Sequence, residues 1–303
     1  MSSTDVPRVS VIIPTYRHRD FVLATLASVF EQTRNDYEII VINDGSTDDT
    51  KAILEPLIEA RRIRYFEQMN RGQSHARNAG LAQARGEFVA FLDDDDLWPA
   101  NKLDWQVRFL DENPLVGAVG GTLQSIDTEG KPGWKGKYFP IIEFERLFHE
   151  NPFLSPGQTL IRTRLLKELG GVNTEVWGAD DWDLWFRITQ VSRLVMVERL
   201  ALYYRLHPQN ASKQRARMLK SCCVVMETHL REVAGRKRHE YRLAAHHNLY
   251  GGFGRPLAGE VGQQLRRGNL AGAARRLREL LPLWRSFMTD RGLAIRLFRD
   301  VRG

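Results

Sequence analysis

The first hundred residues alternate between short apolar runs and segments whose apolar side chains recur with helical spacing. The apolar runs are rich in Val, Ile and Phe, which is typical of strands that are buried on both faces. Strands separated by helices favour a parallel sheet with helices on both sides. The expected strands are residues 9–14, 37–42, 63–66 and 87–92, and the expected helices are residues 20–32, 50–60 and 74–84.

The pattern continues less regularly to about residue 212 and is helical beyond residue 209. Residues 130–140 are rich in Gly, Pro and Lys and are expected to form a mobile loop. We therefore expect an α/β fold with a mostly parallel central sheet flanked by helices and a helical C-terminal extension. Further strands are expected at 116–121, continuing over 122–127 or in an adjoining hairpin, at 159–162 and at 194–197, and further helices at 164–169 and 181–191.

Charge divides the chain into two regions. Residues 213–303 contain 20 Lys and Arg against 7 Asp and Glu, a net charge of +13. The whole chain carries +7, so residues 1–212 carry −6. This contrast indicates regions with different roles, and we expect one domain over residues 1–212 and a basic helical extension over residues 213–303.

Four consecutive carboxylates, Asp93 to Asp96, directly follow the expected strand at 87–92. Ligands of open α/β sheets bind at the carboxyl ends of the strands. Adjacent carboxylates repel one another unless a cation is present, and hard divalent cations prefer oxygen ligands. The cluster therefore favours a divalent metal site, although a solvated acidic loop or a helix N-terminus also produces such a run.

Two other expected strands end in groups suited to a nucleotide base. The strand at 37–42 is followed by Asp44, which can accept a hydrogen bond from the imide N–H of a base such as uracil. The strand at 9–14 is followed by Tyr16, whose ring can lie against a base. The alternatives are an ordinary Asp-Gly turn and a surface aromatic side chain.

Four segments together resemble glycosyltransferase family 2, whose nucleotide-sugar-binding fold is called GT-A. They are VSVIIPTYR (9–17), EIIVINDGSTDDT (38–50), NRGQSHARNAGLAQARGEFVAFLDDDD (70–96) and GADDWDLWFRI (178–188). The resemblance covers about residues 8–212, and its specificity comes from the order and spacing of the segments. It implies an enzyme that transfers a sugar from a nucleotide sugar to an acceptor.

The resemblance also implies where the donor binds. Nucleotide contacts fall on Asp44, on Arg77 and on Asp93, which would face the ribose, whereas Arg77 is alternatively a helix-surface residue. A loop that passes close to the donor sugar contains Gly157. The remaining nucleotide contacts fall on Pro14, Thr15, Tyr16, Arg17 and Asp94.

The metal ligands implied by the resemblance are Asp95, in the Asp-x-Asp signature, and His207, which follows the last expected strand. They would hold Mn²⁺ or Mg²⁺. The extra acid at Asp94 leaves the register open, because Asp94 and Asp96 have the same spacing as Asp93 and Asp95. His207 is alternatively an exposed loop residue.

Catalysis is assigned by the same resemblance to Asp181. The family usually shows Glu-Asp at this place, and Asp180 replaces the Glu in this chain. A carboxylate here would act as the general base of an inverting transfer, removing the proton of the acceptor hydroxyl. From the residues alone, these acids also fit the first turn of a helix, where the helix dipole favours negative charge.

The expected function is sugar transfer from a nucleotide donor, UDP-linked by preference, to a saccharide or lipid-linked acceptor in cell-surface polysaccharide or glycoconjugate synthesis. Two rival functions remain open. One is a non-catalytic nucleotide-sugar-binding protein, and the other is a metal-dependent phosphohydrolase built around Asp93 to Asp96. The latter lacks a nearby Ser or Thr to support an aspartyl nucleophile.

The basic extension contains two apolar stripes flanked by arginines, within residues 273–284 and 294–301. Such helices can lie on an anionic membrane, or they can pack on one another and leave their arginines in solvent. No nucleic-acid-binding motif is found, so no nucleic-acid partner is expected.

The compartment is expected to be the cytoplasm, with peripheral contact at the inner face of the membrane. The start of the chain lacks a basic leader followed by an apolar run. The two cysteines are adjacent, at Cys222 and Cys223, and fit a reducing compartment better than a disulfide framework.

Overall fold

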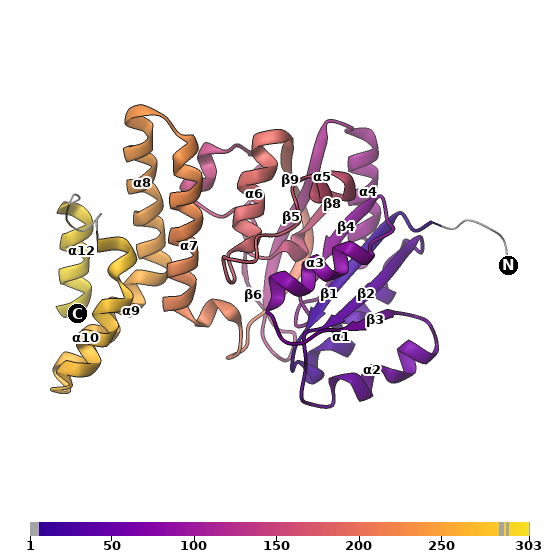
Figure 1. The fold of residues 1–303 in the computed structure, drawn as a ribbon, viewed down its shortest axis with the longest axis horizontal. Coiled ribbons are helices and arrows are strands. Elements are labelled where there is room, and N and C mark those ends of the chain that lie inside the picture. The colour runs from indigo at the N-terminus through magenta and orange to yellow at the C-terminus, as the bar shows by residue number, and fades with distance from the viewer. Residues whose placement is uncertain (1–5, 285–287, 289–290, 303) are drawn as a thin grey trace. The chain divides into compact units, whose positions relative to one another are not determined.

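The computed structural model describes residues 6–284, 288 and 291–302 (Figure 1). These residues belong to two compact units. The second unit combines the C-terminal region with two short segments from the middle of the chain. The first unit comprises Met1–Glu143, Pro152–Glu175 and Asp183–His207, and the second comprises Phe144–Asn151, Val176–Trp182 and Pro208–Gly303.

A nine-stranded sheet forms the centre of the first unit. Its strands are β1 (Val9–Thr15), β2 (Tyr37–Asn43), β3 (Arg64–Glu67), β4 (Phe88–Phe91), β5 (Val116–Ile126), β6 (Pro132–Lys135), β7 (Ile141–Ile142), β8 (Thr159–Arg162) and β9 (Arg193–Arg205). They lie in the order β3-β2-β1-β4-β8-β5-β9-β7, with β6 paired to β5.

The sheet is parallel where the sequence predicts it to be and mixed beyond that point. β1 pairs in parallel with β2 and β4, and β2 pairs in parallel with β3. β8 is inserted between β4 and β5 and runs antiparallel to both. The start of β8 therefore lies at the same edge as the end of β4.

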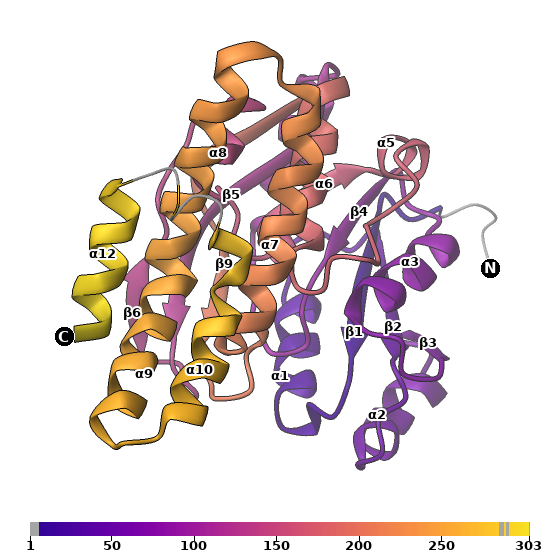
Figure 2. The ribbon, with the colours of Figure 1, turned by 60° about the vertical axis from the view of Figure 1, so that its left-hand side comes forward.

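Side chains of β1 alternate between two helical layers, as expected for a strand with a period of two. Val9, Val11 and Ile13 belong to a core cluster shared with residues of α1 (Arg19–Phe30), α2 (Thr50–Glu59) and α4 (Lys102–Glu112). Ile12 faces the other way, toward Gly80 of α3 (Gln73–Gln83). Figure 2 shows α1 and α3 on opposite sides of β1.

Two more helices follow β8. Helix α5 (Thr163–Glu168) ends before Gly170 and Gly171, whose φ angles of +77° and +79° suit a helix stop. Helix α6 (Asp180–Val191) has its first three residues in the second unit and the remainder in the first. Within the first unit its Trp185 is fully buried, with its ring centre 5.4 Å from that of Phe153.

The second unit is helical in its C-terminal part, as the sequence predicts. Helix α7 buries Leu219, Cys223 and Met226. No helix among the described residues has the length and apolarity needed to cross a membrane. The helices are α7 (Arg215–His229), α8 (Gly235–Leu249), α9 (Arg255–Arg266), α10 (Leu270–Glu279) and α12 (Arg291–Arg302), with a π-helical turn (Tyr250–Gly254) joining α8 to α9.

Two segments differ from the sequence-based expectation. Residues 130–140, expected as a loop, contain strand β6, whose side chains are exposed and whose backbone pairs with β5. Strand β9 continues eight residues beyond the expected end at residue 197 because β5 pairs with it up to Arg205. Backbone pairing with an established strand thus extends the sheet through polar positions.

Gly86 provides a test of how tightly β1 and β4 are joined. A Cβ at Gly86 would lie 2.6 Å from the backbone nitrogen of Ser10 and 2.7 Å from the carbonyl carbon of Val9. Because these are backbone atoms of a central strand, we expect Gly86→Ala to lower the free energy of unfolding by about 1–3 kcal/mol in urea denaturation. The control is Gly259→Ala in α9, where a Cβ meets open space and the change favours the helix by up to about 1 kcal/mol. Equal effects of the two substitutions would contradict the prediction.

Candidate active site

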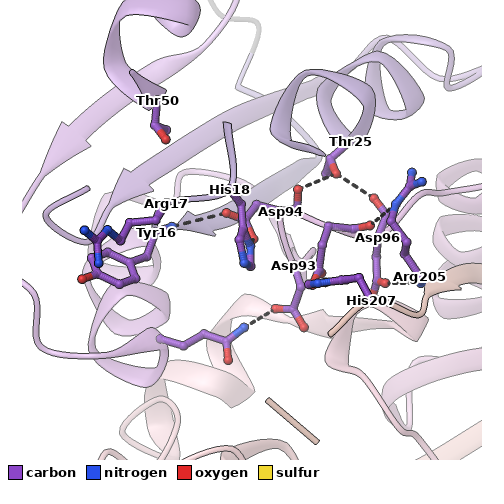
Figure 3. A network of polar contacts seen from close by, with 12 residues as sticks. Tyr16, Arg17, His18, Thr25, Thr50, Asp93, Asp94, Asp96, Arg205 and His207 are labelled. Atoms are coloured by element: carbon purple, nitrogen blue, oxygen red, sulfur yellow. Dashed lines mark hydrogen bonds and ion pairs between the residues drawn. The ribbon is translucent and has the colours of Figure 1, made fainter. Parts of the chain in front are cut away.

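The four carboxylates Asp93–Asp96, here called the acidic run, follow strand β4, and each has different partners. Figure 3 labels three of them, Asp93, Asp94 and Asp96. Asp93 Oδ1 accepts hydrogen bonds from Arg77 Nη2 and Gln73 Nε2, each at 2.6 Å and each from α3. Arg77 is only 3% exposed, so it is not a helix-surface residue. Burial raises the pKa of Asp93, and the charge of Arg77 opposes that shift.

Asp94 is held by the loop after β1. His18 Nδ1 lies 2.8 Å from Asp94 Oδ1, and the backbone N–H of Tyr16 donates to Asp94 Oδ2 at 3.3 Å. Burial disfavours the charged imidazole, but the hydrogen bond and the negative charges of the acidic run outweigh it and raise the pKa of His18 to about 9. His18 and Asp94 therefore form an ion pair at neutral pH.

Asp96 is completely buried, and its hydrogen bonds join neighbouring segments of the first unit. Its Oδ1 accepts from the backbone N–H of Arg205 at 2.9 Å, and its Oδ2 accepts from the Ser155 hydroxyl at 3.4 Å. Burial and the neighbouring acids raise the pKa of Asp96 well above its ordinary value, which favours the neutral acid. The Thr25 hydroxyl lies 2.8 Å from the backbone carbonyl of Asp96 and fixes the chain here.

Asp95 meets the second predicted metal ligand. His207 follows β9, and its Nε2 lies 2.7 Å from Asp95 Oδ2 although 112 residues separate the two in the sequence. The side chain of His207 is 1% exposed, so it is not an exposed loop residue. Parallel pairing of β9 with β5 explains why a residue just beyond β9 reaches this edge of the sheet.

The donor set fits a divalent cation that also binds substrate oxygen atoms. Within the described ranges, no three or more His, Cys, Asp or Glu side chains are grouped to enclose a metal ion. Asp95 and His207 supply one carboxylate and one imidazole. Mg²⁺ commonly takes one or two protein carboxylates and completes its shell with substrate phosphates and water. The pair therefore fits a cation shared with a diphosphate.

Asp44 is buried at the end of β2 and organises the loop before α3. Its Oδ1 accepts from Gln68 Nε2 at 2.7 Å and from the backbone N–H of Arg71 at 2.9 Å, and its Oδ2 accepts from the N–H of Gly72 at 2.8 Å. Gly72 has a φ angle of +94°, which favours glycine. The backbone N–H of Asp44 also donates to the carbonyl of Thr15, so the ends of β1 and β2 are joined.

The predicted nucleotide contacts at the end of β1 divide into two pairs. Pro14 and Thr15 are buried within the strand, whereas Tyr16 and Arg17 are exposed. The Arg17 guanidinium carbon lies 5.7 Å from the centre of the Tyr16 ring. Figure 3 shows these two side chains beside each other and directed away from the acidic run.

Gly157 reaches the site from the start of β8. It belongs to the short turn Pro156–Gln158, which is preceded by Ser155. The Ser155 hydroxyl accepts from the N–H of Gly157 at 3.1 Å and lies 3.5 Å from Asp93 Oδ2. A Cβ at Gly157 would lie 2.9 Å from Leu202 Cδ1, which leaves little room for a side chain.

The sequence model named "Glycosyl transferase family 2" matches residues 10–170, which include β1, the acidic run and the turn at Gly157. The chain belongs to glycosyl transferase family 2. Curated relatives agree: an uncharacterized glycosyltransferase of Rickettsia bellii is 32% identical over 212 residues, covering 68% of this chain and 30% of that protein.

Some relatives of this family 2 glycosyltransferase are named for polysaccharide synthesis. A chondroitin synthase of Escherichia coli is 27% identical over 208 residues, covering 68% of this chain and 30% of that protein. A putative teichuronic acid biosynthesis glycosyltransferase of Bacillus subtilis is 43% identical over 118 residues, covering 38% of this chain and 46% of that protein. The chain spans about a third or less of the length of three Rickettsia relatives that it matches.

Solved structures confirm the predicted GT-A type of fold for this family 2 member. S. aureus TarS 1-349 in complex with UDP-GlcNAc superposes with a TM-score of 0.68 at 18% identity, over 97% of this chain and 89% of that one. A mannosyltransferase of Pyrobaculum calidifontis in complex with GDP-Man and Mn²⁺ has a TM-score of 0.59 at 22% identity, over 97% of this chain and 87% of that one.

The predicted general base of this family 2 member, Asp181, lies in the second unit, in the first turn of α6. Asp181 Oδ1 accepts from the backbone N–H of Trp182 at 2.6 Å. Asp180 is 1% exposed and Asp181 8%. Asp183, in the first unit, instead pairs with Arg187 at 2.7 Å one helical turn later. Its contacts therefore indicate a structural role for Asp183.

Several side chains around the acidic run were not predicted from the sequence. They come from segments whose contact with the run depends on tertiary structure. His18 had the clearest signal, because it follows the end of a strand next to the predicted nucleotide contacts. The unpredicted residues are His18, Thr25, Gln73 and Arg205.

Proposed function

We propose that this protein is an inverting, metal-dependent glycosyltransferase with a UDP-linked sugar donor and a saccharide or lipid-linked acceptor. The observation that carries the proposal is the 2.7 Å contact between Asp95 and His207. It brings together the two residues that the family motifs mark as metal ligands, beside a buried acidic run at the end of β4. We assign the catalytic role to residues 1–212 and treat residues 213–303 as an extension.

Recognition of the donor is proposed for three groups at the ends of the strands. Tyr16 and Arg17 are exposed at the end of β1 and are available to a base. Asp44 already accepts three hydrogen bonds, which leaves about one of the roughly four lone-pair positions of a carboxylate for an imide N–H. UDP-GlcNAc is bound in the TarS structure and GDP-Man in that of the mannosyltransferase, so the base requires a direct test.

The proposed reaction is a single displacement. The Asp181 carboxylate takes the proton of the acceptor hydroxyl as the oxygen attacks the anomeric carbon, and the bond from that carbon to the diphosphate oxygen breaks. When bound, the divalent cation stabilises negative charge on the departing diphosphate. Arg77, paired with Asp93, fixes that carboxylate at the floor of the proposed donor site.

The test is a screen of nucleotide sugars against saccharide and lipid-linked acceptors with Mn²⁺ or Mg²⁺. We expect release of a nucleoside diphosphate that requires donor, acceptor and metal together. Binding of the donor without turnover would instead indicate a nucleotide-sugar-binding protein. Metal-dependent cleavage of simple phosphate esters without an acceptor would indicate a phosphohydrolase. Neither outcome agrees with the proposal.

Contact of the C-terminal helices with the cytoplasmic face of an anionic membrane is a second proposal. Ile295 and Phe298 of α12 are each 67% exposed, and Arg296 and Arg299 of the same helix are also exposed. Trp284 is 51% exposed. Exposed apolar side chains next to arginines suit an interface where acyl chains meet anionic headgroups. Such binding would bring the enzyme to lipid-linked acceptors.

Co-sedimentation with phosphatidylglycerol-containing vesicles tests the membrane proposal. We expect the full chain to bind them at low salt and to bind less at 1 M salt, because the Debye length falls from about 10 Å at 0.1 M to about 3 Å. The double substitution Ile295→Ser and Phe298→Ser should remove the salt-resistant remainder. The control is Leu115→Ser, at a 71% exposed position in the first unit. A full chain that stays in the supernatant would contradict the proposal.

A further inference from the structure

Three side chains spaced four residues apart point from the α4 region toward one short turn. Trp98 precedes α4, Lys102 begins it, and Gln106 lies one turn further along; all three are buried. Their polar groups donate to three successive backbone carbonyls. Trp98 Nε1 donates to Gly157 at 2.9 Å, Gln106 Nε2 to Gln158 at 2.9 Å and Lys102 Nζ to Thr159 at 3.1 Å.

Lys102 is the exceptional member of this set. It is 0% exposed, and within the described part of the chain no nearby carboxylate offsets the cost of its burial. Its Nζ instead lies 3.9 Å from the centre of the Trp98 ring. Burial lowers the pKa of Lys102 well below its ordinary value. A buried amine without an ion-pair partner is costly, and an apolar side chain would fill the same space without that cost.

The turn that these side chains hold reaches the acidic run on its other side. Ser155, just before the turn, places its hydroxyl 3.5 Å from Asp93 Oδ2 and 3.4 Å from Asp96 Oδ2. Gln158 closes the turn, because its Oε1 accepts from the N–H of Leu154 at 2.9 Å. The turn is therefore fixed between α4 and the carboxylates that follow β4.

We propose that Lys102, together with Trp98 and Gln106, is a positioning residue that holds residues 155–159 in the conformation that receives the sugar of the nucleotide-sugar donor. This inference rests on the proposed donor site. In that site the turn with Gly157 lies beside the sugar, as the family resemblance implies, and the nucleoside diphosphate is bound at the ends of β1, β2 and β4. Loss of the Lys102 contact should then affect the sugar more than the nucleotide.

Lys102→Met keeps the length and volume of the side chain and removes its donor. We expect its affinity for UDP-GlcNAc, or for the donor identified by the screen, to fall about tenfold, because the buried Thr159 carbonyl loses the hydrogen bond from Lys102. Affinity for the matching nucleoside diphosphate should stay within twofold. Both affinities are measured by calorimetry with Mn²⁺. Hydrogen exchange in peptides covering residues 154–161 should become at least about tenfold faster.

The matched control is Gln32→Met. Gln32 also bonds the segment around α4, at Pro99 and Leu103, but it does not contact the turn. The Gln32→Met substitution should leave hydrogen exchange in residues 154–161 unchanged. It should also leave the ratio of the affinities for the sugar nucleotide and the nucleoside diphosphate unchanged. Equal loss of sugar-nucleotide and nucleotide affinity in Lys102→Met, or unchanged exchange in the turn, would overturn the inference.

Trp98→Phe is the second probe and decides the matter if Lys102→Met does not fold. It removes the indole N–H that donates to Gly157 and keeps most of the ring packing. The same selective loss of sugar-nucleotide affinity is expected, to a smaller extent. If the unaltered protein binds neither UDP nor UDP-GlcNAc nor any donor of the screen, the proposed function fails. The exchange measurement still tests whether Lys102 holds the turn.

Discussion

Asp181→Asn is expected to lower kcat by about 10²–10⁴ while leaving donor affinity within a few-fold of the unaltered protein. The substitution keeps the shape of the side chain and removes the group that takes the acceptor proton. The amide oxygen can still accept the bond from the N–H of Trp182, so the start of α6 should be preserved. Steady-state kinetics with the donor and acceptor found by the screen, together with calorimetry of donor binding, measure the two quantities.

Asp183→Asn provides the matched control, with the same change in the same helix. Asp183 pairs with Arg187, so its replacement should lower stability and leave kcat within a few-fold. Near-normal turnover of Asp181→Asn would reject Asp181 as the base and make Asp180, the adjacent buried acid, the next candidate.

Asp95→Asn and His207→Ala are each expected to weaken Mn²⁺-dependent donor binding by about 100-fold or more. Substituting a residue that only hydrogen-bonds to a metal ligand commonly lowers metal affinity by about 10–100-fold. Asp95 and His207 are the proposed ligands themselves, so a larger loss is expected. Donor binding in the presence of a chelator should change much less. The measurement is calorimetry with a nucleoside diphosphate, with and without Mn²⁺.

Asp96→Asn is the control for the register of the acidic run. Asp96 is fully buried, its raised pKa favours the neutral acid, and an amide matches the shape of that acid. We expect a change below about threefold in Mn²⁺-dependent binding. A larger loss in Asp96→Asn than in Asp95→Asn would move the metal to the alternative register with Asp94.

The parallel part of the fold was predictable because its strands are short runs of β-branched and aromatic residues with turn residues after them. The apolar composition of such a run indicates that both faces of the strand are buried, as at residues 37–42. The direction of β8 and the existence of β6 were not predictable in this way. Strand direction is set by which neighbour a strand meets, and β6 is exposed and depends on pairing with β5.

The site was predictable where acidic residues directly follow the expected strands. Asp44 and the acidic run stand directly after strands, so the common edge of a parallel sheet brings them to one side. His207 depended on the family resemblance, since its contact with Asp95 requires the full length of β9. Side chains that contact the run from other elements, such as Thr25 and Arg205, carry no signal in sequence spacing.

The acidic run brings less negative charge to the site than its four carboxyl groups suggest. Arg77 neutralises one carboxylate at 2.6 Å, and protonated His18 neutralises another at 2.8 Å. Asp96 is favoured in its neutral form, and Arg205 adds a third cation, with its Nε 2.8 Å from a carbonyl of the run. Three cationic side chains thus lie against the acidic run. An anionic diphosphate therefore meets less repulsion at this edge of the sheet than four carboxylates alone would cause, and a divalent cation that accompanies it lowers the repulsion further.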